Sequence, residues 1–125
     1  MTILDQLAAH ARERVAADQA ENSLDVLQAQ CRALGRGRGE RFRAALEKPE
    51  LSFICEVKKA SPSKGIIAKE FPYLEIARDY ERAGADAISC LTEPKWFLGS
   101  DQIFREIRGA VDTPMLRKDF TVDPY

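Results

Sequence analysis

The sequence lacks the features of a membrane protein and of a nucleic-acid binder. No apolar run approaches the roughly 20 residues that a membrane span requires. The 19 Lys and Arg residues nearly cancel the 20 Asp and Glu residues, and a formal net charge of −1 argues against nucleic acid as the main partner. The first residues, Met1 to Asp5, lack the basic and apolar regions of a secretory signal. We therefore expect a cytoplasmic protein that binds neither membrane nor nucleic acid.

Metal ligands and disulfide partners are also scarce. The three cysteines, Cys31, Cys55 and Cys90, are odd in number and widely spaced, with no C-x-x-C pair. From that spacing we expect neither a metal site nor a disulfide framework. Each cysteine lies in an apolar pattern, so we predict three buried free thiols. The one histidine, His10, is interpreted as a surface or packing residue of the first predicted helix.

Helical signals dominate the beginning of the chain. Thr2 followed by Asp5 is a fair N-cap pattern, and apolar residues then recur at helical spacing. Ser23 and Gly35 mark the start and the stop of a second helix. A short third helix is predicted over residues 40–47.

Strands and helices alternate in the rest of the chain. Strands are predicted at 51–58, 87–91 and 115–119, and amphipathic helices at 73–83 and 100–111. This order is typical of right-handed parallel β/α units. The first strand is followed neither by G-x-G-x-x-G nor by G-x-x-x-x-G-K-[ST], which argues against dinucleotide and P-loop sites. Charged residues at the carboxyl ends of the first and third strands favour a closed eight-fold barrel over an open doubly wound sheet.

The predicted fold class is therefore α/β, a partial (β/α)8 TIM barrel with an N-terminal helical extension. Residues 1–48 are expected to form the extension, and residues 49–125 the first three strands and two helices of the barrel. A complete barrel needs about 200 residues or more, and the first and third strands would be exposed edges. We expect either a fragment of a longer protein or a chain that another copy completes through its open edges.

Side-chain alternation along the strands brings charged groups together. Glu56 and Lys58 share the face of the first strand that would point into the barrel, and Lys118 shares that face of the third. Two neighbouring ammonium groups form an anion site, and one of them can act as a general acid near neutral pH. The structural alternative also stays open, in which these charges keep a strand edge solvated or form a salt-bridged strand end.

Two loops would lie over the same end of the sheet. The polar loop 59–65 contains Ser61, which either binds an anionic substrate or belongs to a solvated turn. The loop 92–99 contains Trp96 and Phe97, which either form an aromatic wall for a substrate or pack beneath the loop.

A run of arginines precedes the first strand. Its members are Arg32, Arg36, Arg38, Arg41 and Arg43. Phe42 is the one aromatic residue among them and Glu40 interrupts the run, so we interpret it as a solvated linker rather than a nucleic-acid site.

Three motifs resemble those of one enzyme family. Residues 55–65, C-E-V-K-K-A-S-P-S-K-G, resemble the first-strand signature [LIV]-x-E-[LIV]-K-[KR]-x-S-P-S-[KR]-G of indole-3-glycerol-phosphate synthases. Residues 87–93 with Phe97 resemble the second strand and its loop, and residues 116–125 resemble the third strand. The resemblance spans nearly the whole chain, including the helical extension.

The resemblance implies a reaction and a set of roles. Members of this family close 1-(2-carboxyphenylamino)-1-deoxyribulose 5-phosphate to indole-3-glycerol phosphate in tryptophan biosynthesis, with loss of carbon dioxide and water and without metal or organic cofactor. Lys118 is similar to the general acid. Lys58 is similar to the lysine that holds substrate anions and assists later proton transfer, and Glu56 to the carboxylate that organises both lysines. The implied substrate-binding residues are Ser61, Phe97 and Phe120.

The chain departs from the family pattern at two places and ends before others. Residues 69–73 differ from the commoner D-F-D-P, and Trp96 stands where tyrosine is frequent. By resemblance, the second catalytic glutamate, an asparagine and the phosphate site lie beyond Tyr125, so we expect the 125-residue chain alone to be inactive. The alternatives are another phosphosugar barrel enzyme and a self-associating partial-barrel module without catalysis.

Overall fold

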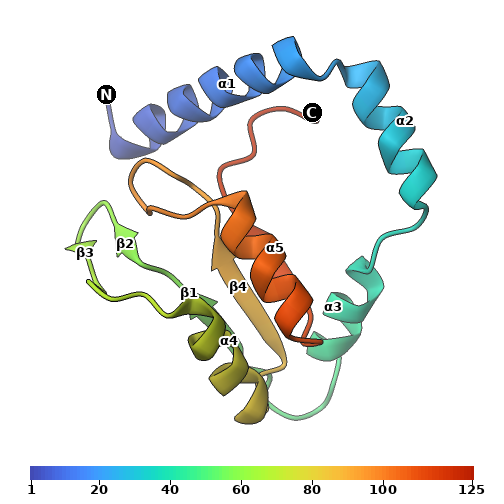
Figure 1. The fold of residues 1–125 in the computed structure, drawn as a ribbon. Coiled ribbons are helices and arrows are strands. Elements are labelled where there is room, and N and C mark those ends of the chain that lie inside the picture. The colour runs from blue at the N-terminus through green and yellow to red at the C-terminus, as the bar shows by residue number, and fades with distance from the viewer. The chain divides into compact units, whose positions relative to one another are not determined.

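The computed structural model describes residues 1–125 and divides them into two compact units. The first unit is Met1–Gly37 together with Phe120–Tyr125, and the second is Arg38–Asp119. Figure 1 shows the elements of each unit. None of the helices combines the length and the apolar character that crossing a membrane requires.

The first unit contains two helices whose ends are set by local hydrogen bonds. They are α1 (Ile3–Glu21) and α2 (Leu24–Leu34). The Thr2 hydroxyl accepts the amide N–H of Asp5, and the Asp5 carboxylate accepts that of Thr2, so the predicted cap is confirmed as a capping box. The Ser23 hydroxyl caps α2 by accepting the N–H of Val26, and Gly35 ends this helix at a φ of 73°.

The second unit is built on a parallel sheet. In chain order its elements are α3 (Gly39–Leu46), β1 (Ile54–Val57), β2 (Ala60–Ser61), β3 (Gly65–Ile66), α4 (Tyr73–Arg82), β4 (Ala87–Leu91), α5 (Asp101–Ala110) and β5 (Met115–Lys118). The strands β1, β4 and β5 pair in that order and are parallel, with α4 and α5 as the connections between them. The predicted α/β class is confirmed, and the open sheet is consistent with part of a (β/α)8 barrel.

One face of this sheet is buried beneath α4 and α5 (Figure 1). The residues of this core that are at most 1% exposed are Val57, Ala77, Ile88, Cys90 and Ile107. The opposite face is open at the two edge strands, where Ile54 is 49% and Leu116 is 43% exposed, whereas the residues of β4 on that face are buried. Because side chains alternate along each strand, every second residue of a strand belongs to the core, and the residues between them lie on the open face.

The first strand is shorter than predicted. It extends over 54–57 rather than 51–58, because its ladder with β4 begins at Ile54, opposite Ala87, and β4 is its one partner. The N–H of Phe53 donates instead to a carboxylate oxygen of Asp86 at 2.8 Å, and that carboxylate also binds Lys48 at 2.6 Å. Hydrogen bonds from Lys48 and from the Phe53 amide lower the pKa of Asp86 below its ordinary value.

The loop predicted at 59–65 forms part of a hairpin. β2 and β3 pair antiparallel, with Ala60 opposite Ile66 and Ser61 opposite Gly65. Gly65 has a φ of 61°, a conformation that favours glycine. The sequence gives no clear signal of this pairing, because each strand has only two residues and polar turn residues separate them.

The prediction of three buried thiols was right only for Cys90. Cys31 is exposed and Cys55 is half-buried. Helix α2, which carries Cys31, has no buried residue, so its apolar stripe does not belong to a core. Burial raises the pKa of the Cys90 thiol to about 11, which leaves it unreactive at neutral pH.

The core beneath α5 gives a test of this fold. Ile107 is 0% exposed, and we expect Ile107→Ala to lower the free energy of unfolding by about 2–5 kcal/mol, because it removes buried apolar volume and leaves a cavity. Urea unfolding followed by circular dichroism measures this change. The control is Arg105→Ala on the exposed side of the same helix, for which we expect a change within about 0.5 kcal/mol. Equal effects of the two substitutions would contradict the described core.

Candidate active site

Three charged side chains meet at the carboxyl end of the sheet. Glu56 lies opposite Ser89 in the β1–β4 ladder, and Lys118 lies opposite Leu91 in the β4–β5 ladder. These positions share the face that points away from α4 and α5, as side-chain alternation requires. Lys58 directly follows β1 and joins the same group.

The Glu56 carboxylate connects the two lysines. Its Oε1 lies 3.2 Å from Lys58 Nζ, and its Oε2 lies 2.7 Å from Lys118 Nζ. The Ser89 hydroxyl donates to the same Oε2 at 3.1 Å. The Lys58 side chain is 32% exposed and that of Lys118 is 50% exposed, so a ligand from solvent can reach both ammonium groups. Two ammonium groups and one carboxylate give the group a net positive charge, which suits an anion.

Hydrogen bonds fix the backbone on each side of this group. The Tyr80 hydroxyl, on α4, donates to the carbonyl oxygen of Glu56 at 2.8 Å. The N–H of Thr92 donates to the carbonyl oxygen of Lys118 at 3.0 Å, which ties the end of β4 to the end of β5. Arg117 points to the opposite face and pairs there with the first residue of α5 at 2.9 Å. Lys118 is therefore held on the open face by its neighbours on both sides.

The lysines change the ionisation of Glu56. Burial raises the pKa of its carboxyl group, but hydrogen bonds from Lys118, Lys58 and Ser89 outweigh this effect, and the pKa lies below its ordinary value. A depressed pKa in the folded state means that these bonds stabilise the fold above the ordinary pKa of about 4.3. This stabilisation is lost as the pH falls through the folded-state pKa.

The other predicted site residues lie in different surroundings. Ser61 is buried at the end of β2, and its hydroxyl accepts the N–H of Lys64 at 3.3 Å, within the hairpin turn. Phe97 is half-buried in the loop after β4. Phe120 belongs to the first unit. The structure thus brings together the three charged residues, and Ser61 is not part of their hydrogen-bonded group.

A buried carboxylate, which the sequence analysis did not single out, shapes the loop after β4. Glu93 is 1% exposed, and its Oε1 accepts the N–H of Lys95 at 2.9 Å. Its Oε2 accepts the N–H groups of Trp96 and Phe97 at 2.7 and 3.0 Å. One side chain therefore fixes the turn that carries both aromatic residues. A signal was present in the sequence, since an acidic residue stands two positions after a strand of entirely apolar or small residues and precedes Pro94.

The same loop folds back closely onto β4. The N–H of Gly99 donates to the carbonyl oxygen of Glu93 at 2.9 Å. A Cβ atom at the position of Gly99 would lie 2.2 Å from the carbonyl oxygen of Leu91. This distance is a steric clash, so only glycine fits here. Leu98 has a φ of 53°, which is unusual for a residue with a side chain and indicates strain in the turn.

The chain is similar to known proteins along nearly its whole length. The family model described as indole-3-glycerol phosphate synthase matches residues 4–125. The indole-3-glycerol phosphate synthases of Ruminiclostridium cellulolyticum and Lacticaseibacillus paracasei are each 50% identical to it over 123 residues, which cover 98% of the chain and 47% of the relative. That of Endomicrobium trichonymphae is 46% identical over 123 residues, covering 98% and 48%. The chain spans about half the length of the curated relatives it matches.

The Glu93 turn can be tested through the fluorescence of Trp96, the one tryptophan of the chain. In Glu93→Gln an amide N–H₂ group faces backbone N–H donors, and we expect the free energy of unfolding to fall by about 1–3 kcal/mol. We also expect the Trp96 emission to move to longer wavelength, because the turn opens to water. Glu70→Gln, at an exposed position, is the control. Unchanged emission and stability in Glu93→Gln would show that the turn does not depend on this carboxylate.

The ionisation of Glu56 can be measured directly. We expect Lys118→Met to raise the pKa of Glu56, because it removes a hydrogen bond and a positive charge that favour the carboxylate. Carbon-13 NMR titration of labelled glutamate carboxyl groups reports this change. Arg117→Gln removes a charge from the next residue, on the opposite face, and is expected to leave that pKa nearly unchanged. A pKa of Glu56 that is the same in Lys118→Met would contradict the described contact.

Proposed function

The chain belongs to the indole-3-glycerol-phosphate synthase family, and on that basis we propose that it forms the amino-terminal half of such an enzyme and carries its general acid. The observation that supports this proposal is the Glu56 carboxylate, which holds Lys58 and Lys118 at hydrogen-bonding distance on one open face. The proposed substrate is 1-(2-carboxyphenylamino)-1-deoxyribulose 5-phosphate. Its carboxylate and phosphate groups are anions, which the net positive charge of the site attracts.

In this proposal Lys118 is the general acid of ring closure. The ring carbon that bears the carboxylate attacks the ketone carbon of the substrate, and a carbon–carbon bond forms. The ketone oxygen takes a proton from the Lys118 ammonium group, which its bond to Glu56 orients. Loss of carbon dioxide then restores the aromatic ring, and loss of water completes the indole.

The remaining residues bind and orient the substrate in this proposal. Lys58 holds the substrate carboxylate beside the reacting carbon and assists the later proton transfer. Glu56 positions both ammonium groups, since each of its oxygens binds one of them. Ser61 belongs to the substrate-binding hairpin, and Phe97 and Phe120 line the space around the anthranilate ring.

A chimera tests whether the chain supports this reaction. Residues 1–125 replace the aligned segment of the Ruminiclostridium cellulolyticum enzyme, of which they cover 47%. The fluorescence of indole-3-glycerol phosphate measures product formation. We expect the chimera to be active, and Lys118→Ala in it to lower kcat by about 10²- to 10⁴-fold, the usual contribution of a general acid. Lys118→Arg is not expected to rescue activity, because a guanidinium group does not release its proton at neutral pH.

Two controls complete this experiment. Arg117→Gln in the chimera removes a neighbouring charge on the opposite face and is expected to keep nearly the full rate. The 125-residue chain alone is expected to give no product, since the proposed enzyme needs its second half. An active isolated chain, or a Lys118→Ala chimera with a nearly unchanged kcat, would contradict the proposal.

A further inference from the structure

A second group of cationic side chains lies at the opposite end of β5. It surrounds a pocket of about 190 Å³ within the second unit, between α3, α5 and the start of β5. The lining residues that matter here are Arg38, Arg41, Phe42, Phe104, Arg108 and Met115. Met115 begins β5 and Lys118 ends it, so this pocket is separate from the group around Glu56.

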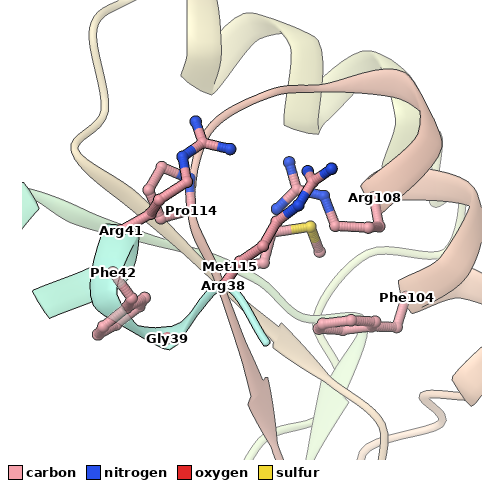
Figure 2. A pocket seen from close by; sticks show the side chains of 8 residues that line it. All are labelled: Arg38, Gly39, Arg41, Phe42, Phe104, Arg108, Pro114 and Met115. Atoms are coloured by element: carbon pink, nitrogen blue, oxygen red, sulfur yellow. The ribbon is translucent and has the colours of Figure 1, made fainter. Parts of the chain in front are cut away.

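The pocket has a charged side and an apolar side. Figure 2 shows the three guanidinium groups above and the rings of Phe42 and Phe104 below. One of the arginines is neutralised, because Arg41 donates to the carboxylate of Asp112 at 3.2 and 3.0 Å. Arg38 forms no ion pair.

Arg108 lies deepest among these arginines and is incompletely satisfied. One of its terminal nitrogens donates to the carbonyl oxygen of Val111 at 2.6 Å, whereas its Nε is buried and has no hydrogen-bond partner. Burial lowers the pKa of Arg108, and the charges of Arg38 and Arg41 lower it further, against opposing effects of Asp112 and Glu81.

The pocket therefore contains positive charge that the surrounding protein does not fully compensate. A buried donor without a partner is costly, and like charges at short range repel. An anion in the pocket would pair with the guanidinium groups of Arg38 and Arg108 and reduce the repulsion between them.

We propose that this pocket binds a small organic anion that joins a carboxylate or phosphate group to an aromatic part. Guanidinium groups bind either oxyanion through paired N–H donors. The phenyl rings and the Met115 side chain would cover the aromatic part of the ligand. The pocket is smaller than the roughly 300–1,000 Å³ of sites for drug-sized molecules, so the ligand has the size of a single substituted ring. This site uses none of the residues of the proposed reaction.

NMR of the 125-residue chain with nitrogen-15 in its arginine Nε atoms tests this proposal. The probes are benzoate and phenyl phosphate, with inorganic phosphate as the anion without a ring and benzyl alcohol as the ring without a charge. We expect at least one aromatic anion to shift the Arg108 Nε–H signal saturably, at lower concentration than inorganic phosphate does, and benzyl alcohol to leave it unchanged. The stronger of the two aromatic anions identifies the preferred oxyanion. No saturable shift, or binding no tighter than that of inorganic phosphate, would overturn the proposal.

Variants of the same chain locate the binding site, with the Arg41 Nε–H signal as the probe. We expect Arg38→Gln and Arg108→Gln each to weaken binding at least about tenfold, because each removes charged donors. Arg38 is exposed, so its replacement tests the site even where loss of Arg108 disturbs the fold. Arg105→Gln, on the exposed side of α5, and Lys118→Met are expected to bind normally. Unchanged binding in Arg38→Gln and Arg108→Gln, or its loss in Lys118→Met, would overturn the proposal.

Discussion

The carboxylate of Glu56 reaches across the whole width of the sheet, since it lies on β1 and binds Lys118 on β5 while β4 lies between them. Its other oxygen binds Lys58, at the end of its own strand. Without this carboxylate, two ammonium groups would lie near each other and lose the counter-charge that they share. The backbone ladders through β4 fix the distance between the two edge strands, and at that distance this one carboxylate can bind both lysines.

One face of the sheet stabilises the fold, and the other carries the charged residues of the site. Val57 and Ile107 are buried on the side of the helices, where apolar area removed from water stabilises the unit. Glu56, one residue before Val57, lies on the open side. Loops complete the site, and the buried Glu93 shows that such a loop needs its own internal anchor, because no strand or helix constrains it. A rigid turn can then present aromatic side chains in a fixed place.

Features of the fold that depend on neighbouring residues were predicted better from the sequence than features that depend on distant residues. The caps at Thr2 and Ser23 depend on partners three residues away, so their patterns sufficed. The length of β1 depends on where β4 begins, and the exposure of Cys31 depends on whether another element covers α2. Neither can be read from the segment itself. For the site, alternation along strands placed the charged residues on one face, whereas the convergence of three N–H groups on Glu93 follows from the fold of a loop that has no periodic pattern.

The contact between Glu56 and Lys118 joins residues that are 62 positions apart in the chain. Helices and the small hairpin form from neighbours within microseconds, whereas a contact across so long a segment requires both β/α units to be in place. Closing the loop also removes chain entropy before any bond compensates for it. The paired lysines therefore depend on the complete sheet, and a chain with its helices formed but its strands unpaired would have no anion site there. Binding of a charged ligand at this site therefore reports that the sheet of this chain is complete, whereas its helix content does not.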